Sequence, residues 1–202
     1  MIRLWRKRLK VEKAMKYTHG TIKGYLKDLG AKLPAPGGGS VAALSAAMAA
    51  SLIRMVCQFT LGKEKYKKSQ SRIKEILSRS QQLQKRLGEL VDEDVKAYRS
   101  KNLEKAIKVP VEICFLSYDL MMLAEEVIDR GNRNLVSDAG LAALLSEASF
   151  ISGLFYIKVN LKYLKRKVKK YKKLTAELKD LLKKIKKIRK KVEVKVGYFI
   201  GW

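Results

Sequence analysis

The segment Pro-Ala-Pro-Gly-Gly-Gly-Ser at residues 34–40 is the first part of this sequence whose residue types suggest chemistry. Glycines let a backbone approach a ligand closely, and a helix start offers free N–H groups and a positive dipole. Such a loop suits a carboxylate, a phosphate or a polar heterocycle. An ordinary loop before a capped helix is the alternative, but three successive glycines are conformationally costly for that role alone. The Gly-Lys-Ser/Thr ending of a Walker phosphate loop is absent.

Asn132–Leu141 (NRNLVSDAGL) is the second candidate segment. Ser and Asp accept backbone N–H bonds at helix starts, so we expect Ser137 or Asp138 to cap the helix that follows. Spacing alone favours this structural role over catalysis. For residues 60–66 (TLGKEKY), spacing alone likewise favours a solvated basic turn.

The remaining titratable residues narrow the chemistry. Asp92, Glu93 and Asp94 are adjacent, so they point in different directions around a helix, and we expect surface or helix-end pairing and no metal site. The single histidine, His19, is expected to be structural or exposed, which leaves no Ser-His-Asp set and disfavours zinc. The two cysteines lie in apolar segments and are expected to be free thiols. Acid–base catalysis would therefore fall to carboxylates, lysines or tyrosines.

The periodic spacing of hydrophobic residues predicts α-helices, and we expect these helices to hold the candidate segments in place. The Ala-rich helix over 40–60 is expected to be central and buried, with Ser40 as its N-cap. Pro110 is expected to kink its helix or to begin a new segment. The fold class is therefore all-α, a single-domain helical bundle around a small-residue central helix. The expected helices cover residues 17–29, 40–60, 69–98, 103–130 and 137–160, followed by a long C-terminal helix with an apolar seam from Leu164 to Val192.

Three segments are expected along the chain. Residues 1–16 form a basic N-terminal extension, which is either an upstream extension before Met15 or a short amphipathic helix on a membrane. Residues 17–191 form the helical domain, and residues 192–202 (VEVKVGYFIGW) form an apolar, β-prone C-terminal tail. The apolar run at 41–61 contains Arg54 and Gln58, which favours a buried core helix over a membrane span.

The chain carries a formal net charge of +26, from 45 Lys and Arg against 19 Asp and Glu in 202 residues. Such a charge favours a nucleic acid or an anionic surface as the partner. However, residues 1–16 (+6) and 158–191 (+15) carry most of it, so the body between them is nearly balanced. Aromatic residues are few within the lysine run, which disfavours specific nucleic-acid recognition. Alternatively, the seam of the long helix drives oligomerisation.

Taken together, these motifs resemble the formimidoyltetrahydrofolate cyclodeaminase / methenyltetrahydrofolate cyclohydrolase family. Any one block alone is a weak signal, whereas six blocks in the family's order make a specific match across about residues 17–165. The blocks are PAPGGGSVAAL at 34–44, TLGKEKY at 60–66, DVKAY at 94–98, VPV at 109–111, GNRNLVSDAG at 131–140 and VNL at 159–161.

The resemblance implies an all-α, homodimeric, cytoplasmic enzyme of folate one-carbon metabolism. It implies conversion of 5-formiminotetrahydrofolate to 5,10-methenyltetrahydrofolate with release of ammonia. The alternative within the family is hydrolysis of the methenyl compound to 10-formyltetrahydrofolate. Both reactions pass through a tetrahedral carbon between two nitrogens and need only proton transfers, so no metal or redox cofactor is expected. A basic nucleic-acid or anionic-surface binding protein, and an inactive family member, are the remaining alternatives.

The resemblance also assigns site residues. Asp138 becomes the first candidate for general acid–base catalysis or for holding the pterin. Lys63 and Lys65 would bind the glutamate tail, including that of a polyglutamylated folate. The residues expected to line the folate cleft are Pro36, Gly37, Gly38, Gly39 and Ser40 of the loop, with Asn134, Ser137, Glu147 and Asn160 in second rank.

Two departures from the family pattern bear on this expectation. Asp94 and Pro110 are 16 positions apart, whereas the family usually has about a dozen more residues there, so one wall of the cleft is missing or rebuilt. The family commonly has a second Asn four positions before the one matched at Asn160, and Tyr156 stands there instead. The site also requires that one ligand contact both residues 36–40 and residues 134–140.

Overall fold

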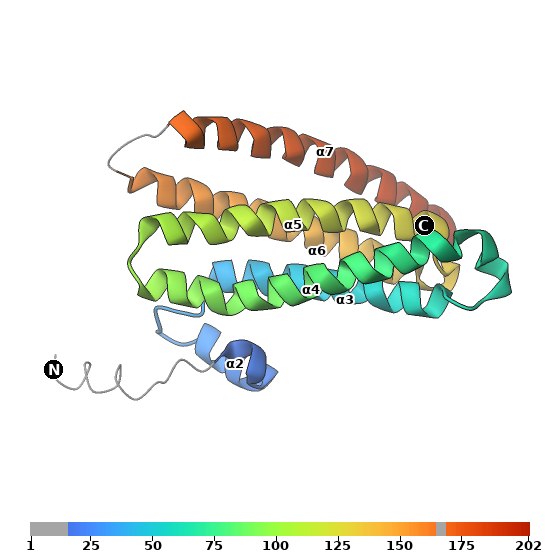
Figure 1. The fold of residues 1–202 in the computed structure, drawn as a ribbon, viewed down its shortest axis with the longest axis horizontal. Helices are drawn as coiled ribbons and strands as arrows, with labels where there is room; N and C mark the ends of the chain where they lie inside the picture. Colours follow the sequence, from blue (N-terminus) through green and yellow to red (C-terminus); the bar gives the residue numbers. More distant parts are fainter. Residues whose placement is uncertain (1–15, 165–168) are drawn as a thin grey trace.

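The computed structural model describes residues 16–164 and 169–202, so the predictions for residues 1–15 lie outside the described residues. Six α-helices and three short 3-10 segments make up this part of the chain, which contains no strand, and the all-α prediction is confirmed (Figure 1). The α-helices are α2 (Ile22–Leu29), α3 (Gly38–Thr60), α4 (Gln70–Arg99), α5 (Leu103–Arg130), α6 (Val136–Lys162) and α7 (Lys169–Ile200), and the 3-10 segments are η1 (Tyr17–His19), η2 (Glu64–Ser69) and η3 (Arg133–Leu135).

Helices α3 to α7 lie lengthwise and alternate in direction, while the short α2 lies beside one end of the bundle (Figure 1). Short connections force consecutive helices to be antiparallel neighbours. The N-terminus of α3 therefore lies at the same end as the C-termini of α4 and α6. The C-terminus of α3 lies at the opposite end, together with η2, η3 and the N-terminus of α6.

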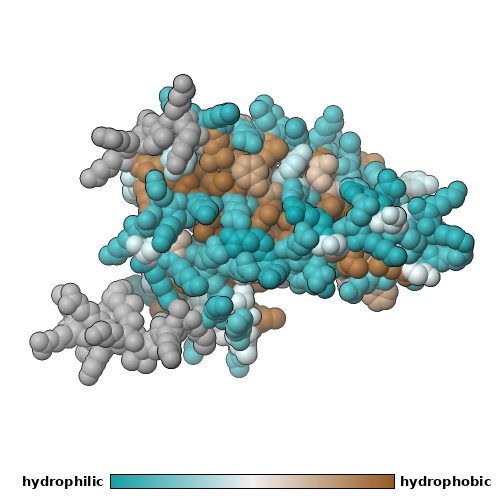
Figure 2. All heavy atoms as spheres, viewed as in Figure 1, coloured by the Kyte–Doolittle hydropathy of each residue, from teal (hydrophilic) through white to brown (hydrophobic). Residues whose placement is uncertain are grey.

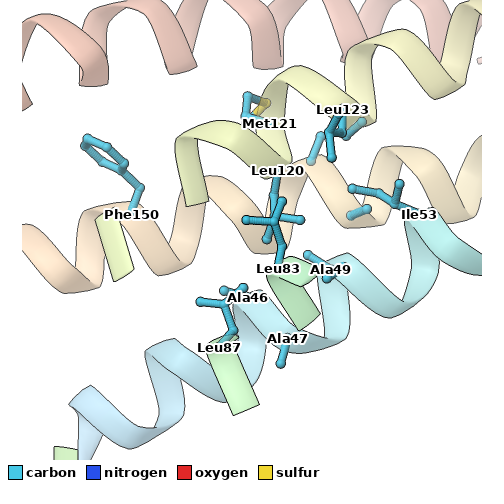
Figure 3. Packing of buried hydrophobic residues seen from close by; sticks show 14 of the residues in the cluster. Ala46, Ala47, Ala49, Ile53, Leu83, Leu87, Leu120, Met121, Leu123 and Phe150 are labelled. Atoms are coloured by element: carbon cyan, nitrogen blue, oxygen red, sulfur yellow. The ribbon is translucent and has the colours of Figure 1, made fainter. Parts of the chain in front are cut away.

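Helix α3 is the central helix, as its composition predicts. It packs against α4, α5 and α6. Small side chains keep these helices close, and larger side chains from α4 and α5, among them Leu83, Leu87 and Leu120, complete the buried cluster (Figure 3). The alanines of α3 that are buried in this cluster are Ala42, Ala43, Ala46, Ala47, Ala49 and Ala50.

Helix α5 continues without interruption through Pro110, which is buried, so the helix is neither ended nor restarted there. Close packing against α6 surrounds this position. A Cβ atom added at Gly153 of α6 would lie 2.9 Å from the Pro110 carbonyl oxygen and 2.6 Å from Cys114 Sγ. Gly153 is thus the point at which α6 approaches the backbone of α5.

Helix α7 continues the predicted seam beyond its expected end. Leu178, Ile185 and Val192 are buried, and Val196 packs on Gly140 of α6. The expectation of a separate β-prone tail over 192–202 is wrong, because the helix runs to Ile200. Tertiary packing of valines four residues apart outweighs their weak helix propensity.

Some of the lysines of α7 hold it to the bundle. Lys191 Nζ lies 3.4 Å from Glu125 Oε1, and Lys195 Nζ lies 2.6 Å from Asp129 Oδ1, both on α5. At its N-terminal half, α7 and α5 line a pocket of about 440 Å³. Apolar side chains are visible along the strip between α5 and α7, whereas the surface over α4 is largely hydrophilic (Figure 2).

Two stretches of the described chain, Gly38–Thr60 and Arg133–Lys162, are long and apolar enough to cross a membrane by length and composition alone. Of the 18-residue apolar window in each stretch, 56% and 50% respectively are buried inside the bundle. Burial of this extent agrees with the expected role of α3 as a core helix.

We predict that Gly153→Ala destabilises the protein, because the new methyl group would collide with the Pro110 carbonyl oxygen and Cys114 Sγ. Thermal unfolding should show a midpoint lowered by several degrees. Gly88→Ala on α4 is the matched control, because no atom lies within 4 Å of the added Cβ. Alanine has the higher helix propensity, so this variant should unfold at the same or a higher temperature. Equal midpoints for the two variants would contradict the close α5–α6 contact.

Candidate functional site

The glycine-rich loop leads directly into the first turn of α3. The helix begins at Gly38 with Gly37 as its N-cap, so the expectation that Ser40 is the cap is wrong. Ser40 is the third residue of the helix and is fully buried, and its Oγ lies 3.1 Å from Tyr25 Oη of α2. The serine hydroxyl therefore contacts the neighbouring helix, and the first backbone N–H groups of α3 have no acceptor within the helix itself.

Two functional groups lie against consecutive glycines of this turn. A Cβ atom at Gly38 would lie 1.7 Å from Tyr156 Oη, and one at Gly39 would lie 2.1 Å from Asp94 Oδ1. Any side chain at either position would displace the phenol of α6 or the carboxyl group of α4. This close approach explains two of the three successive glycines in physical terms.

The environment of Asp94 makes its carboxyl group suitable for proton transfer. Burial raises the pKa of Asp94 to about 6, although the backbone N–H of Ser40 binds the carboxylate and acts in the opposite direction. Burial also raises the pKa of Tyr25; its bond to Ser40 lowers that pKa, and the charge of Asp94 raises it. A carboxyl group that titrates near neutral pH can both accept and return a proton during one reaction.

The three adjacent acids of α4 have different partners. Asp92 is buried and accepts bonds of 2.7 Å from the Tyr17 backbone N–H and from the Thr18 hydroxyl, which hold η1. Glu93 accepts from Arg86, at 2.6 Å from its Nη1. Asp94 accepts from the Ser40 backbone N–H in the first turn of α3, so it too pairs at a helix end, and its raised pKa sets it apart from the other two acids. Spacing gave no reason to single this residue out, and its only signal was its place in the resembling block at 94–98.

A second cluster lies at the opposite end of the bundle. The Asn132 backbone N–H donates to Thr60 Oγ1 at 2.8 Å, and its side chain donates to the Phe59 carbonyl oxygen at 3.2 Å. The Arg133 backbone N–H donates to Tyr66 Oη at 3.1 Å. These bonds fasten η3 to the C-terminal end of α3 and to η2, which also carries Lys65 and follows Lys63.

Asp138 belongs to this second cluster. It lies in the first turn of α6, which starts at Val136 with Leu135 as the N-cap and no capping side chain. The expectation that Ser137 or Asp138 caps this helix is therefore wrong. Asp138 is half-buried, whereas Ser137 and Asn134 are exposed. A carboxylate in the first turn still benefits from the positive end of the helix dipole.

The two clusters are separated by the length of α3. Its 23 residues span about 33 Å at 1.5 Å per residue. One reacting carbon cannot contact both Asp94 and Asp138 of the same protomer, so the expectation of a single cleft that joins residues 36–40 to residues 134–140 within one protomer is wrong. The sequence already contained a reason to expect this separation, because residues 40–60 were predicted to form one continuous helix.

Two other expected cleft residues hold helices together. Glu147 lies between the clusters and pairs with Arg189 of α7, at 3.0 Å from its Nε. Asn160 donates from its side chain to the Ala106 carbonyl oxygen at 2.7 Å and ties the end of α6 to α5. Each of these two side chains therefore has a partner within the protein.

Residues 16–164 and 169–202 contain no group of three or more His, Cys, Asp or Glu side chains that could hold a metal ion. Cys57 and Cys114 are buried, and burial raises the pKa of each thiol to about 12. Such thiols are poor nucleophiles near neutral pH. Within these residues, the groups placed for proton chemistry are Asp94 and the hydroxyl groups around it.

A sequence model of the formiminotransferase-cyclodeaminase family matches residues 21–101 and 99–180, and so includes both clusters. The chain belongs to this family. The two matched segments meet at the turn between α4 and α5, which is where the sequence is expected to be shorter than the family pattern.

Relatives of known activity support this membership. The methenyltetrahydrofolate cyclohydrolase of Methylorubrum extorquens is 34% identical over 167 residues, which are 71% of this chain and 80% of that protein. The formimidoyltransferase-cyclodeaminase of Mus musculus is 27% identical over 165 residues, which are 70% of this chain but only 30% of that protein. The fold resembles a formiminotetrahydrofolate cyclodeaminase of Thermotoga maritima, with a TM-score of 0.78 and 24% identity over 92% of this chain and 100% of that chain.

The half-buried Asp94 carboxyl group makes a testable contribution to stability. Because the folded pKa of Asp94 is raised, its favourable contribution is present below the ordinary pKa and is lost as pH rises through about 6. Asp94→Asn keeps the shape and the acceptor for the Ser40 N–H but removes the charge. We predict that this variant exceeds the wild type in free energy of unfolding by up to about 3 kcal/mol above pH 7.

Denaturant unfolding at several pH values measures this difference. The advantage of Asp94→Asn should shrink toward zero near pH 4, where both proteins carry a neutral group at position 94. Glu89→Gln, which alters an exposed carboxylate on the same helix, should show no comparable dependence on pH. A variant advantage that is constant from pH 4 to pH 8 would contradict the raised pKa.

Proposed function

We propose that this chain is a folate one-carbon enzyme that forms or consumes 5,10-methenyltetrahydrofolate. The observation that carries the proposal is the Asp94 carboxyl group, whose pKa is raised to about 6 and which lies against Gly39 at the N-terminus of α3. A glycine-lined helix start accepts a flat polar ring, and a carboxyl group titrating near pH 6 can move protons beside that ring.

In the cyclodeaminase reaction, 5-formiminotetrahydrofolate reacts with its formimino group protonated, as an amidinium, and N10 attacks the formimino carbon to give a tetrahedral aminal. Asp94 takes the proton from N10 and delivers it to the amine nitrogen. The C–N bond to that nitrogen then breaks, ammonia leaves, and the methenyl cation remains. One carboxyl group thus serves as base and then as acid, and ends in its starting state.

The cyclohydrolase reaction is the second candidate, because the relative named for it is 34% identical and matches over 80% of its length. Here water attacks the methenyl carbon and gives a tetrahedral carbinolamine. Asp94 takes a proton from that water and delivers it to N5. The C–N5 bond then breaks while the carbinol hydroxyl loses its proton to solvent, which leaves 10-formyltetrahydrofolate and one released proton. The same group performs the same two transfers in both reactions.

We also infer that the complete site forms between two copies of the chain. Large apolar side chains line the α3–α6 side of the bundle between the two clusters, and a face of this kind normally covers a partner. A two-fold axis at the middle of that face would bring the Asp94 end of one copy to the Asp138 end of the other. The half-exposed or exposed apolar side chains are Met48, Phe59, Leu141, Leu144, Phe155 and Val159.

In such a dimer, the second cluster would supply the substrate contacts expected of it. Asp138 would bind the pterin from the partner copy, and the exposed Lys63 and Lys65 would meet the carboxylates of the glutamate tail, including a polyglutamate. We place the enzyme in the cytoplasm, where reduced folates and free thiols such as Cys57 and Cys114 both persist.

Methenyl absorbance measures both candidate activities. Formimino substrate should make the absorbance rise with release of ammonia in the first case, and methenyl substrate should make it fall faster than without enzyme in the second. Because the base form of Asp94 is needed, kcat/KM should fall as pH drops below about 6. Asp94→Asn should lose at least about 100-fold in kcat at neutral pH. Folate binding without turnover of either substrate would contradict the enzymatic proposal.

Subunit mixing tests the composite site. Asp94→Asn and Asp138→Asn chains should each be inactive, whereas dimers that contain one of each should have one intact site. A statistical mixture should therefore recover about a quarter of the wild-type activity, since half of the dimers are mixed and one of their two sites is complete. Sedimentation confirms that the variants still pair. No recovery in mixed dimers would show that Asp94 and Asp138 do not serve a common site.

A further inference from the structure

Tyr156 occupies the position at which the resemblance predicts an asparagine, and its hydroxyl group lies in the candidate site. A Cβ atom at Gly38 would lie 1.7 Å from Tyr156 Oη and 2.7 Å from Cζ. A Cβ atom at the next residue, Gly39, would likewise collide with the Asp94 carboxyl group. Two consecutive glycines of one helical turn thus receive a phenol from α6 and a carboxyl group from α4.

The surroundings of Tyr156 position it without enclosing it. Four residues later on α6, the side-chain amide of Asn160 donates to the Ala106 carbonyl oxygen, which fixes this end of α6 on α5. Tyr156 itself is 37% exposed, and its hydroxyl lies against Gly38 at the α3 N-terminus. It faces the same helix start as Asp94 from the opposite neighbouring helix.

The chemistry at this position differs from that of an asparagine. A phenol reaches farther from its own helix than a carboxamide and presents one oxygen that both donates and accepts. Beside a tetrahedral carbon, such a group can bind a heteroatom that carries a lone pair and a proton at once. The amine nitrogen of the aminal and the hydroxyl of the carbinolamine both fit this description.

We propose that Tyr156 is a catalytic residue whose hydroxyl binds the exocyclic nitrogen or oxygen on the one-carbon centre while Asp94 transfers the proton. The inference rests on the proposed function and adds to it the group that recognises the leaving amine or the attacking water. The phenol and the carboxyl group would contact the reacting carbon from α6 and α4, with the first turn of α3 between them.

Tyr156→Phe removes only the hydroxyl and is the first test. We expect kcat to fall by about tenfold with KM changed less than twofold, because the lost contact forms chiefly at the tetrahedral stage. Tyr156→Asn restores a donor and an acceptor, but its carboxamide is too short to reach the same place, so it should not recover that loss. Tyr163→Phe, at an exposed tyrosine two turns further along the chain, is the matched control and should retain wild-type kcat.

Gly38→Ala tests the same contact from the other side. Its methyl group would take the place of the Tyr156 hydroxyl, so the loss in Gly38→Ala/Tyr156→Phe should be smaller than the product of the two single losses. Thermal unfolding checks that the variants are folded. Wild-type kcat in Tyr156→Phe, with Asp94→Asn inactive, would overturn the role of Tyr156 and leave the proposed function standing. Inactivity of the wild type with both substrates would instead reject the proposed function.

Discussion

The small side chains of α3 are the constraint on which the rest of the structure depends. Because six of its twelve buried residues are alanines and Gly39 is another, neighbouring helices can approach its backbone closely over residues 39–50. The same closeness at its first turn brings a carboxyl group and a phenol against a helix start. Larger residues along α3 would separate the helices, open the core and remove the groups around Gly38 and Gly39 together.

The environment that suits Asp94 to proton transfer also reduces the stability of the bundle. A carboxyl group held among helix ends loses hydration, and the N–H of Ser40 replaces only part of what water supplied. That loss is also what moves its titration into the range useful for proton transfer. Asp92, two residues earlier, shows the contrast, because two short bonds to η1 satisfy its carboxylate and suit it to a structural role.

Patterns within single helices were readable from the sequence, whereas contacts between helices were not. The alanine pattern of α3 and the periodicity of α4 predicted those helices and their buried faces correctly. The caps at Ser40 and Ser137 failed because each helix starts on a residue whose own side chain does not cap it. The segment after Val192 remained helical, and within it Val196 packs on Gly140 of α6, which propensity alone does not reveal.

The candidate site was partly predictable for the same reason. The glycine loop predicted that another group lies close to its backbone. Nothing nearby in the sequence indicated that these groups are Asp94 and Tyr156, because both are far from the loop in sequence. The block that held Asp138 carried the strongest resemblance, yet α3 places it at the other end of the protomer. Composition also gave no sign that lysines of α7 pair with acids of α5 and so help to hold the helix to the bundle.

The bonds from Asp92 to Tyr17 and Thr18 define where this bundle can be joined to other modules. These bonds hold η1, and the chain continues from η1 into α2. Tyr25 of α2 contacts Ser40, so the segment from η1 to α2 is attached to the bundle at two points near the first turn of α3. A junction placed before Lys16 would leave both attachments intact. A junction between residues 17 and 37 would separate the two attachments and leave α2, which carries Tyr25, without one of them. Residues 17–37 are therefore part of the catalytic module and not a linker.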